Sequence, residues 1–129
     1  MPNRLTKIFT RTGDEGYTSL GDTRHSKDEL IIEALGNIDE LNSAIGMIIA
    51  MRPQNEDVIH CLTQIQQDLF DLGAEFHVPE RVCINADKVK WMETQLQTFN
   101  ATLPPLKEFL LPRGNPSSAA SHVARTVCR

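Results

Sequence analysis

Three stretches of the chain repeat apolar residues at the steps of three and four that give a helix one apolar face. They span residues 28–51, 56–76 and 86–102, and each pattern predicts an amphipathic helix. In the second stretch the steps alternate between four and three, which is the spacing of a heptad seam. We expect the three stripes to face a shared core. Their residues are Ile31, Leu35, Ile38, Leu41, Ile45, Ile48 and Ile49, then Val58, Leu62, Ile65, Leu69, Leu72 and Phe76, then Val89, Met92, Leu96, Phe99 and Leu103.

Turn-forming residues separate these helices. Residues 52–55 read RPQN, residues 77–85 make a longer link, and four prolines interrupt residues 103–116, where a continuous helix is excluded because proline breaks one. Asn85 stands where a helix N-cap belongs, and Asn115 followed by Pro116 predicts the start of a fourth helix. No run alternates apolar and polar residues, so we expect no sheet beyond a short extended piece near Ile8. The pattern therefore predicts an all-α protein, an antiparallel helix bundle.

Composition limits the class of protein. The 129 residues suit one domain, and 40% hydrophobic with 23% charged residues describe an ordinary soluble protein. Three scattered cysteines without a CxxC pair fit a reducing compartment. No apolar run is long enough to cross a membrane, and the first residues lack the apolar stretch of a secretory signal. We expect a cytoplasmic protein with no membrane partner.

Charge is distributed unevenly. The net charge of −4 argues against a nucleic-acid partner. Residues 1–27 carry five Lys or Arg against three Asp or Glu, whereas residues 28–129 carry eight against fourteen. A modestly cationic arm on an acidic body suits a small anionic ligand better than a polyanion.

The segment TRTGDEGYT, residues 10–18, is the first candidate site. Its glycines permit close approach of backbone N–H groups, and its threonine hydroxyls could join them on phosphate oxygens. Lysine and arginine nearby could add charge. By composition alone the segment favours a solvated surface loop, and it is not a Walker A loop. The residues concerned are Thr10, Arg11, Thr12, Gly13, Asp14, Gly16, Thr18 and Lys27.

Three further segments could carry chemistry. In GNIDELNSAIG, residues 36–46, Asp39 and Asn42 share a helix row that is either a solvated polar face or a place where something approaches closely. Phe109 lies in an apolar, proline-flanked loop that could meet a flat ligand or a partner subunit, or plug the bundle end. Arg125 and Arg129 share one row of the last helix and need an anion, an acidic side chain or solvent. No spacing of His and Cys matches a zinc site.

Taken in order, TRTGDEGYTSLGDTRHSKD, ALGNIDELNSAIG, FLLPRGN and ASHVARTVCR resemble the ATP:cobalamin adenosyltransferases of the propanediol-utilisation type. The resemblance implies a five-helix bundle assembled as a homotrimer, with each active site between neighbouring subunits. It implies transfer of the 5′-deoxyadenosyl group of ATP to reduced cobalamin, with release of triphosphate. Residues 1–27 would form a phosphate-binding arm and residues 28–129 the bundle, in one domain 1–129.

The resemblance also implies roles for single residues. Residues 10–18 would wrap the triphosphate, with Arg11 and Lys27 as cations and Mg²⁺ sharing the charge. Asp39 would pair with Arg125 across the subunit interface, and Phe109 would cover the lower face of cobalamin and exclude its axial ligand. The remaining matches to nucleotide-site motifs are Glu40, Asn42 and Arg129.

The chain departs from the family pattern in places. LPRGNPSSAASH has Arg113 where the family has glycine, and the family continues past RTVCR, so we expect an incomplete last helix. A chain without that continuation could bind cobalamin as a carrier without turnover, or form a bundle with no ligand. The active enzyme would need a reductase partner and an adenosylcobalamin-dependent acceptor enzyme.

Overall fold

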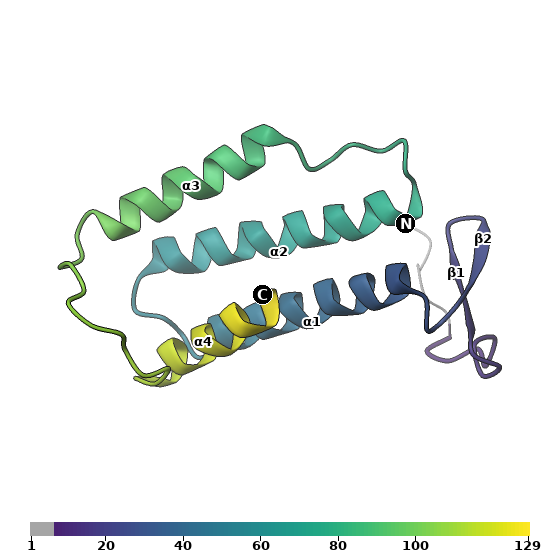
Figure 1. Cartoon of the computed structure of the whole chain (residues 1–129), viewed down its shortest axis with the longest axis horizontal. Helices are drawn as coiled ribbons and strands as arrows, with labels where there is room; N and C mark the ends of the chain where they lie inside the picture. Colours follow the sequence, from purple (N-terminus) through teal and green to yellow (C-terminus); the bar gives the residue numbers. More distant parts are fainter. Residues whose placement is uncertain (1–6) are drawn as a thin grey trace.

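The computed structural model describes residues 7–129, in which four helices follow a two-stranded hairpin (Figure 1). The first six residues of the predicted arm lie outside the described residues. The elements are β1 Tyr17–Leu20, β2 Thr23–Ser26, α1 Leu30–Ala50, α2 Glu56–His77, α3 Ala86–Asn100 and α4 Pro116–Cys128. Each predicted helix is present within two residues of its expected limits, so the helical fold class is confirmed. Within residues 7–129, no helix combines the length and apolarity needed to cross a membrane.

Asparagine side chains cap the N-termini of α2, α3 and α4. Asn55 Oδ1 accepts a hydrogen bond from the Asp57 amide at 2.9 Å, and Asn115 Oδ1 accepts one from the Ser118 amide at 2.8 Å. Asn85 Oδ1 accepts from the amides of residues 87 and 88, at 3.1 and 3.2 Å. These bonds satisfy N–H groups that a helix leaves unpaired at its start. The predicted caps at Asn85 and Asn115 are confirmed.

The core lies where α4 packs against α1. Its buried side chains are Ala44, Ile45 and Ile48 of α1 and Ala124 of α4, and residues of α2 such as Leu62 and Ile65 pack around them. Figure 1 shows that α4 starts beside the C-terminal end of α1 and runs back along that helix. The side chains that α4 packs against α1, Ala120 and Ala124, are small, and three of the four buried residues of this cluster belong to α1.

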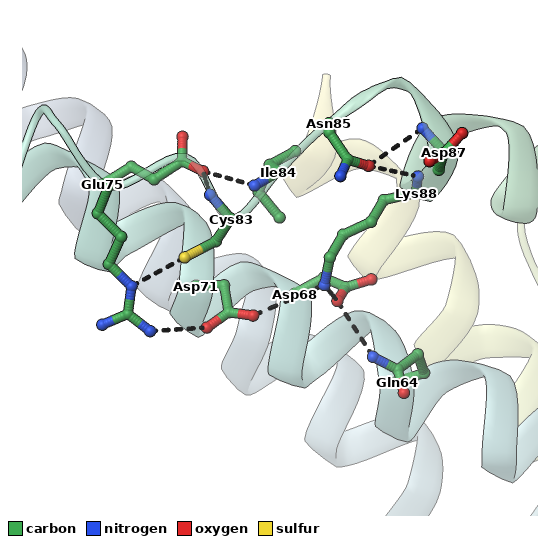
Figure 2. Close-up of polar contacts among 10 residues, drawn as sticks. Gln64, Asp68, Asp71, Glu75, Cys83, Ile84, Asn85, Asp87 and Lys88 are labelled. Carbon is green, nitrogen blue, oxygen red and sulfur yellow. Dashed lines mark hydrogen bonds and ion pairs between the residues drawn. The ribbon is translucent and has the colours of Figure 1, made fainter.

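Polar contacts join the α2–α3 connection to α2 (Figure 2). One carboxylate oxygen of Glu75 accepts from the Cys83 and Ile84 amides, each at 2.5 Å. The Lys88 ammonium pairs with Asp68 and lies 3.6 Å from an oxygen of Asp71. The hydrogen bond to Asp68 raises the pKa of Lys88 above its ordinary value. The start of α3 is thus held by charge and hydrogen bonds.

The apolar stripe predicted on α3 does not reach a closed core. Val89, Met92 and Leu96 are exposed, and α2 and α3 face each other across an open apolar groove lined by residues such as Ile65 and Phe99. The prediction that all three stripes meet in one core is wrong for α3, because the two helices are separated by this groove.

The hairpin is a second difference from the sequence prediction. We expected an extended piece near Ile8, but Ile8 is exposed and belongs to no strand, and residues 17–26 form the antiparallel pair instead. Gly21 opens the two-residue loop with φ +57°, as hairpin loops of this length require. Only Leu20 is buried, so the strands show no apolar alternation that sequence patterning could detect.

The hairpin is fixed to the bundle at two places, the end of α2 and the start of α1. A Cβ at Gly21 would lie 2.5 Å from the His77 carbonyl oxygen, so the turn rests directly on the end of α2. At the start of α1, Glu29 accepts from His25 Nδ1 and from the Ser26 amide, both at 2.8 Å. The hydrogen bond from His25, followed by that from Ser26, lowers the pKa of Glu29.

Truncating the core should be far more damaging than truncating the adjacent surface. Ile48 is 4% exposed and Met47 is 55% exposed. We expect Ile48→Ala to lower the free energy of unfolding by about 2–4 kcal/mol through lost burial and a residual cavity. The control Met47→Ala should change it by about 0.5 kcal/mol or less. Urea unfolding followed by circular dichroism measures both, and equal losses would contradict the assignment of the core.

Protonation of Glu29 should loosen the junction between the hairpin and α1. Because the pKa of Glu29 is lowered in the fold, its contribution is complete above the ordinary glutamate pKa and is lost as pH falls through the lowered value. The Ser26 amide chemical shift, followed by NMR, reports this titration directly. His25→Ala should move the midpoint upward; an unchanged midpoint would show that His25 does not stabilise the carboxylate.

Candidate functional site

Residues 10–16 form a closed turn before the hairpin. The Asp14 amide donates to the Arg11 carbonyl at 3.4 Å, and the Gly16 amide donates to the Gly13 carbonyl at 3.2 Å. The hydroxyls of Thr10 and Thr12 lie 2.9 Å apart. The predicted segment is therefore an ordered turn, in which hydroxyl groups and backbone amides gather within a few residues.

Lys27 lies over this turn. Its amide donates to the Gly16 carbonyl at 2.9 Å, which ties the end of the hairpin to the turn. A Cβ built on Gly13 would lie 3.0 Å from Lys27 Nζ and 3.1 Å from the Tyr17 carbonyl oxygen. The absent side chain of Gly13 leaves room for the ammonium. The structure thus brings together two predicted site residues that are 14 positions apart in the sequence.

Arg24 is a residue of this site that sequence reasoning missed. Its Nη2 donates to the Thr12 carbonyl at 3.1 Å, and its guanidinium lies 5.8 Å from the centre of the Tyr17 ring. It supports the turn from β2. A hairpin loop at Gly21 and Asp22 was the available sequence signal. Recognising it would have placed Arg24 on the second strand, opposite Ser19.

Arg11 has a separate environment. Its backbone adopts φ +61°, unusual for a residue with a side chain, and its guanidinium lies 5.7 Å from the centre of the Phe9 ring. Together with Lys27 and Arg24, it gives the turn three cationic side chains. Such a turn, with amides and hydroxyls beside it, can bind an anion.

Asp39, on α1, lies where a hollow beside the hairpin meets a groove between α1 and α2. Thr18 and Asp39 line one hollow of about 310 Å³ with His77, and Asp39 and His77 also line a groove of about 490 Å³ between α1 and α2. The hollow and the groove therefore adjoin. His77, which sequence reasoning also missed, borders both.

Asn42 follows the second of the two readings of its helix row, in which another element approaches closely. It is buried, and its side chain reaches the backbone of α2, so the row from Asp39 turns from solvent toward α2 at this position. Asp39 and Glu40 are exposed. Within residues 7–129 neither of these two carboxylates has an ion-pair partner.

Arg125 and Arg129 lie on the exposed side of α4 and at its end. In the described part of the chain neither makes an ion pair, so the predicted pair of Asp39 and Arg125 does not form within one chain. Ala124 faces the core instead. The arginine side chains are free to meet an anion or another molecule.

Phe109 is separated from the turn by the length of the bundle. It lies in the connection between α3 and α4 and is fully exposed, so it does not plug the bundle end. Figure 1 shows this connection and the hairpin at opposite ends of α1. A helix of 21 residues is about 30 Å long. One chain therefore does not bring Phe109 and residues 10–16 to the same small ligand.

The described residues do not form a complete set of protein ligands for a metal ion. Within residues 7–129 no three His, Cys, Asp or Glu side chains converge as a metal cluster. The turn itself offers Asp14 and hydroxyl groups. This donor set fits Mg²⁺ carried largely by phosphate oxygens, because Mg²⁺ commonly takes one or two protein carboxylates and completes its shell with phosphates and water.

Comparison with known proteins identifies the family. Residues 8–129 match the family model described as cobalamin adenosyltransferase. The chain is 48% identical over 130 residues to the cobalamin adenosyltransferase of Cupriavidus metallidurans, covering 100% of this chain and 71% of the relative. It is 41% identical over 139 residues to the corrinoid adenosyltransferase of Mycobacterium tuberculosis, with coverage of 100% and 71%.

A solved structure agrees. A variant of the PduO-type ATP:corrinoid adenosyltransferase from Lactobacillus reuteri, complexed with cobalamin and ATP, superposes with a TM-score of 0.83 at 31% identity. The superposition covers 94% of this chain and 71% of that one. The resemblance first drawn from four short motifs is confirmed across almost all of the sequence. This chain belongs to the cobalamin adenosyltransferase family.

Proposed function

We propose that this protein transfers the 5′-deoxyadenosyl group of ATP to cob(I)alamin and releases triphosphate. The observation that carries the proposal is the close superposition on a relative that holds both cobalamin and ATP. The family match over residues 8–129 supports the same reaction. The cationic turn before the hairpin supplies the chemistry that the phosphate end of ATP needs.

The turn would hold the triphosphate. Lys27 over Gly13 and the nearby Arg11 offer positive charge. The threonine hydroxyls offer hydrogen bonds, as do those amides of residues 10–18 that are not already bonded within the turn. Bound Mg²⁺ would neutralise further charge on the phosphates, with Asp14 as a carboxylate of the turn. Glu40 and Arg129 complete the proposed nucleotide site, and the buried Asn42 would act on it only through the side chains that it contacts.

The reaction asks for positioning rather than for an activated protein nucleophile. Co(I) donates its electron pair to C5′ of ATP, a Co–C bond forms, and the C5′–O bond breaks with its electrons leaving on triphosphate. The protein must hold C5′ in line with cobalt and stabilise the charge of the leaving group. The cations of the turn fit this second task.

Each active site would lie between two copies in a homotrimer. The turn and the loop of Phe109 lie at opposite ends of one chain (Figure 1), and both Asp39 and Arg125 lack an ion-pair partner within residues 7–129. A neighbouring copy would supply Arg125 to Asp39 and bring Phe109 toward the nucleotide. Phe109 would cover the lower face of cobalamin, exclude the axial ligand and make Co(II) easier to reduce.

The proposed reaction also defines partners. A reductase must deliver an electron to Co(II), and an adenosylcobalamin-dependent enzyme must accept the product. We propose that the protein works with both in the cytoplasm.

Anaerobic incubation with chemically reduced cobalamin and Mg-ATP tests the proposed function. We expect adenosylcobalamin to form, as followed in the visible spectrum. Lys27→Met should lower kcat/KM for ATP by about tenfold or more, because a charge-assisted contact to phosphate is lost. Lys90→Met, an exposed lysine on α3, is the matched control and should leave the rate unchanged. Absence of product with the unaltered chain would overturn the proposal.

Replacing Phe109 should affect reduction more than transfer. With Phe109→Ala we expect the rate starting from Co(II) and a reductant to fall at least about tenfold more than the rate starting from Co(I). Leu110→Ala, the exposed neighbour in the same loop, controls for general disturbance of the loop. Equal losses from the two starting states would remove the proposed role of Phe109.

A further inference from the structure

Two side-chain amides join α1 to α2 in a reciprocal pair. Asn42 Nδ2 donates to the backbone carbonyl of Gln66 at 3.2 Å, and Gln66 Nε2 donates to the backbone carbonyl of Asn42 at 3.0 Å. Turning either amide over would set its oxygen against a carbonyl oxygen, since only the NH₂ group donates. The pair therefore fixes the orientation of both side chains.

Gly46 makes room for this pair. It lies one turn after Asn42 on α1, and a Cβ there would be 3.3 Å from Gln66 Nε2. Glycine in a helix interior is less stable than alanine, so its presence here needs a reason. The close approach of the Gln66 amide to the α1 backbone provides that reason.

The pair leaves one strong acceptor unused. Asn42 is 6% exposed, and its Oδ1 is buried without a hydrogen-bond partner. A buried acceptor in this condition gains stability from any donor that reaches it. Asn42 also lines the groove of about 490 Å³ between α1 and α2. Its Oδ1 is covered by its own chain, so a donor that enters this groove reaches the oxygen once the lining side chains shift.

The chemistry of the groove selects the occupant. Asp39, one helical turn before Asn42, lines the same groove and has no ion-pair partner within residues 7–129. Gly73, which has no side chain, and Ala74 line it from α2. Arg81 also lines it, but its guanidinium is bonded to Asp71 and Cys83. A carboxylate beside a neutral acceptor suits an arginine, whose guanidinium presents several donors in a rigid fork.

We propose that Gln66 and Gly46 are positioning residues that hold Asn42 Oδ1, beside Asp39, as a second acceptor for Arg125 of a neighbouring copy. This inference rests on the proposed pairing of Asp39 with Arg125 between copies. Arg125 is exposed on α4, while Ala120 and Ala124 pack toward α1. One arm of its guanidinium would meet the carboxylate, and another would enter the groove to meet the amide oxygen.

A double-mutant cycle on self-association tests the inference. Gln66→Met keeps the side-chain length and removes the donor, and Arg125→Ala removes the proposed guest. Sedimentation of the full chain gives the concentration at which half of the molecules are assembled. We expect each single change to raise that concentration by about tenfold or more. Gln66→Met should add little in the Arg125→Ala background, because its effect acts through the arginine.

Two matched variants guard against a merely structural effect. Gln67→Met changes the exposed neighbour on α2 and should leave assembly unchanged. Gly46→Ala should reproduce Gln66→Met and show the same dependence on Arg125. Circular dichroism checks that each variant keeps its helices. Loss of helix in Gln66→Met would transfer the test to Gly46→Ala in the same cycle.

The outcomes separate this inference from the proposed function. Additive effects of Gln66→Met and Arg125→Ala, or no self-association at all, would overturn the positioning role. An effect of Arg125→Ala without any effect of Gln66→Met would do the same while keeping the pairing with Asp39. Coupled effects support it, even if a separate assay finds no adenosylcobalamin, in which case the proposed function alone fails.

Discussion

The close packing of α4 on α1 is the contact on which the rest of the structure depends. The buried cluster consists of three α1 side chains and Ala124 of α4. Because one face of α4 packs against α1, the arginines on the other face of α4 point outward. Because α4 covers one face of α1, another face of α1 is available to pack against α2 and to line the groove that contains Asp39 and Asn42. A single small core thus orients both halves of the candidate interface.

The hairpin extends this order to the cationic turn of residues 10–16. Gly21 rests on the carbonyl of His77, and Glu29 binds the end of β2 at the start of α1. The turn of residues 10–16 is linked through Lys27 to the same hairpin. Its cations are therefore held at one end of the bundle, whereas Phe109 lies in the connection at the other. The proposed site needs both ends, so it would be completed by a neighbouring copy, and this separation is the physical argument for the proposed assembly.

Local signals explain which parts of the fold were predictable. Periodicity located three helices, and Asn115 followed by Pro116 located the fourth; Asn85 and Asn115 marked starts that the structure confirms with hydrogen bonds. Such caps involve residues two or three positions apart, so neighbouring sequence is enough to recognise them. The hairpin was not predicted from the sequence, because only its Leu20 is buried and its two polar strands show no alternation of apolar and polar residues. The apolar stripe on α3 was recognised, but its exposure was not, since a stripe does not reveal how close the facing helix will be.

The sequence by itself determined the helices, their caps, the cationic character of the opening arm and the motifs that identify the family. These depend on residue type and on short spacing. Only the tertiary structure decided that Lys27 lies over Gly13, that Thr18 and Asp39 share a hollow, and that Asn42 faces Gln66 across 24 positions of sequence. Each of these contacts joins separate elements, and its geometry follows from how helices and hairpin pack, which no local pattern of residues specifies.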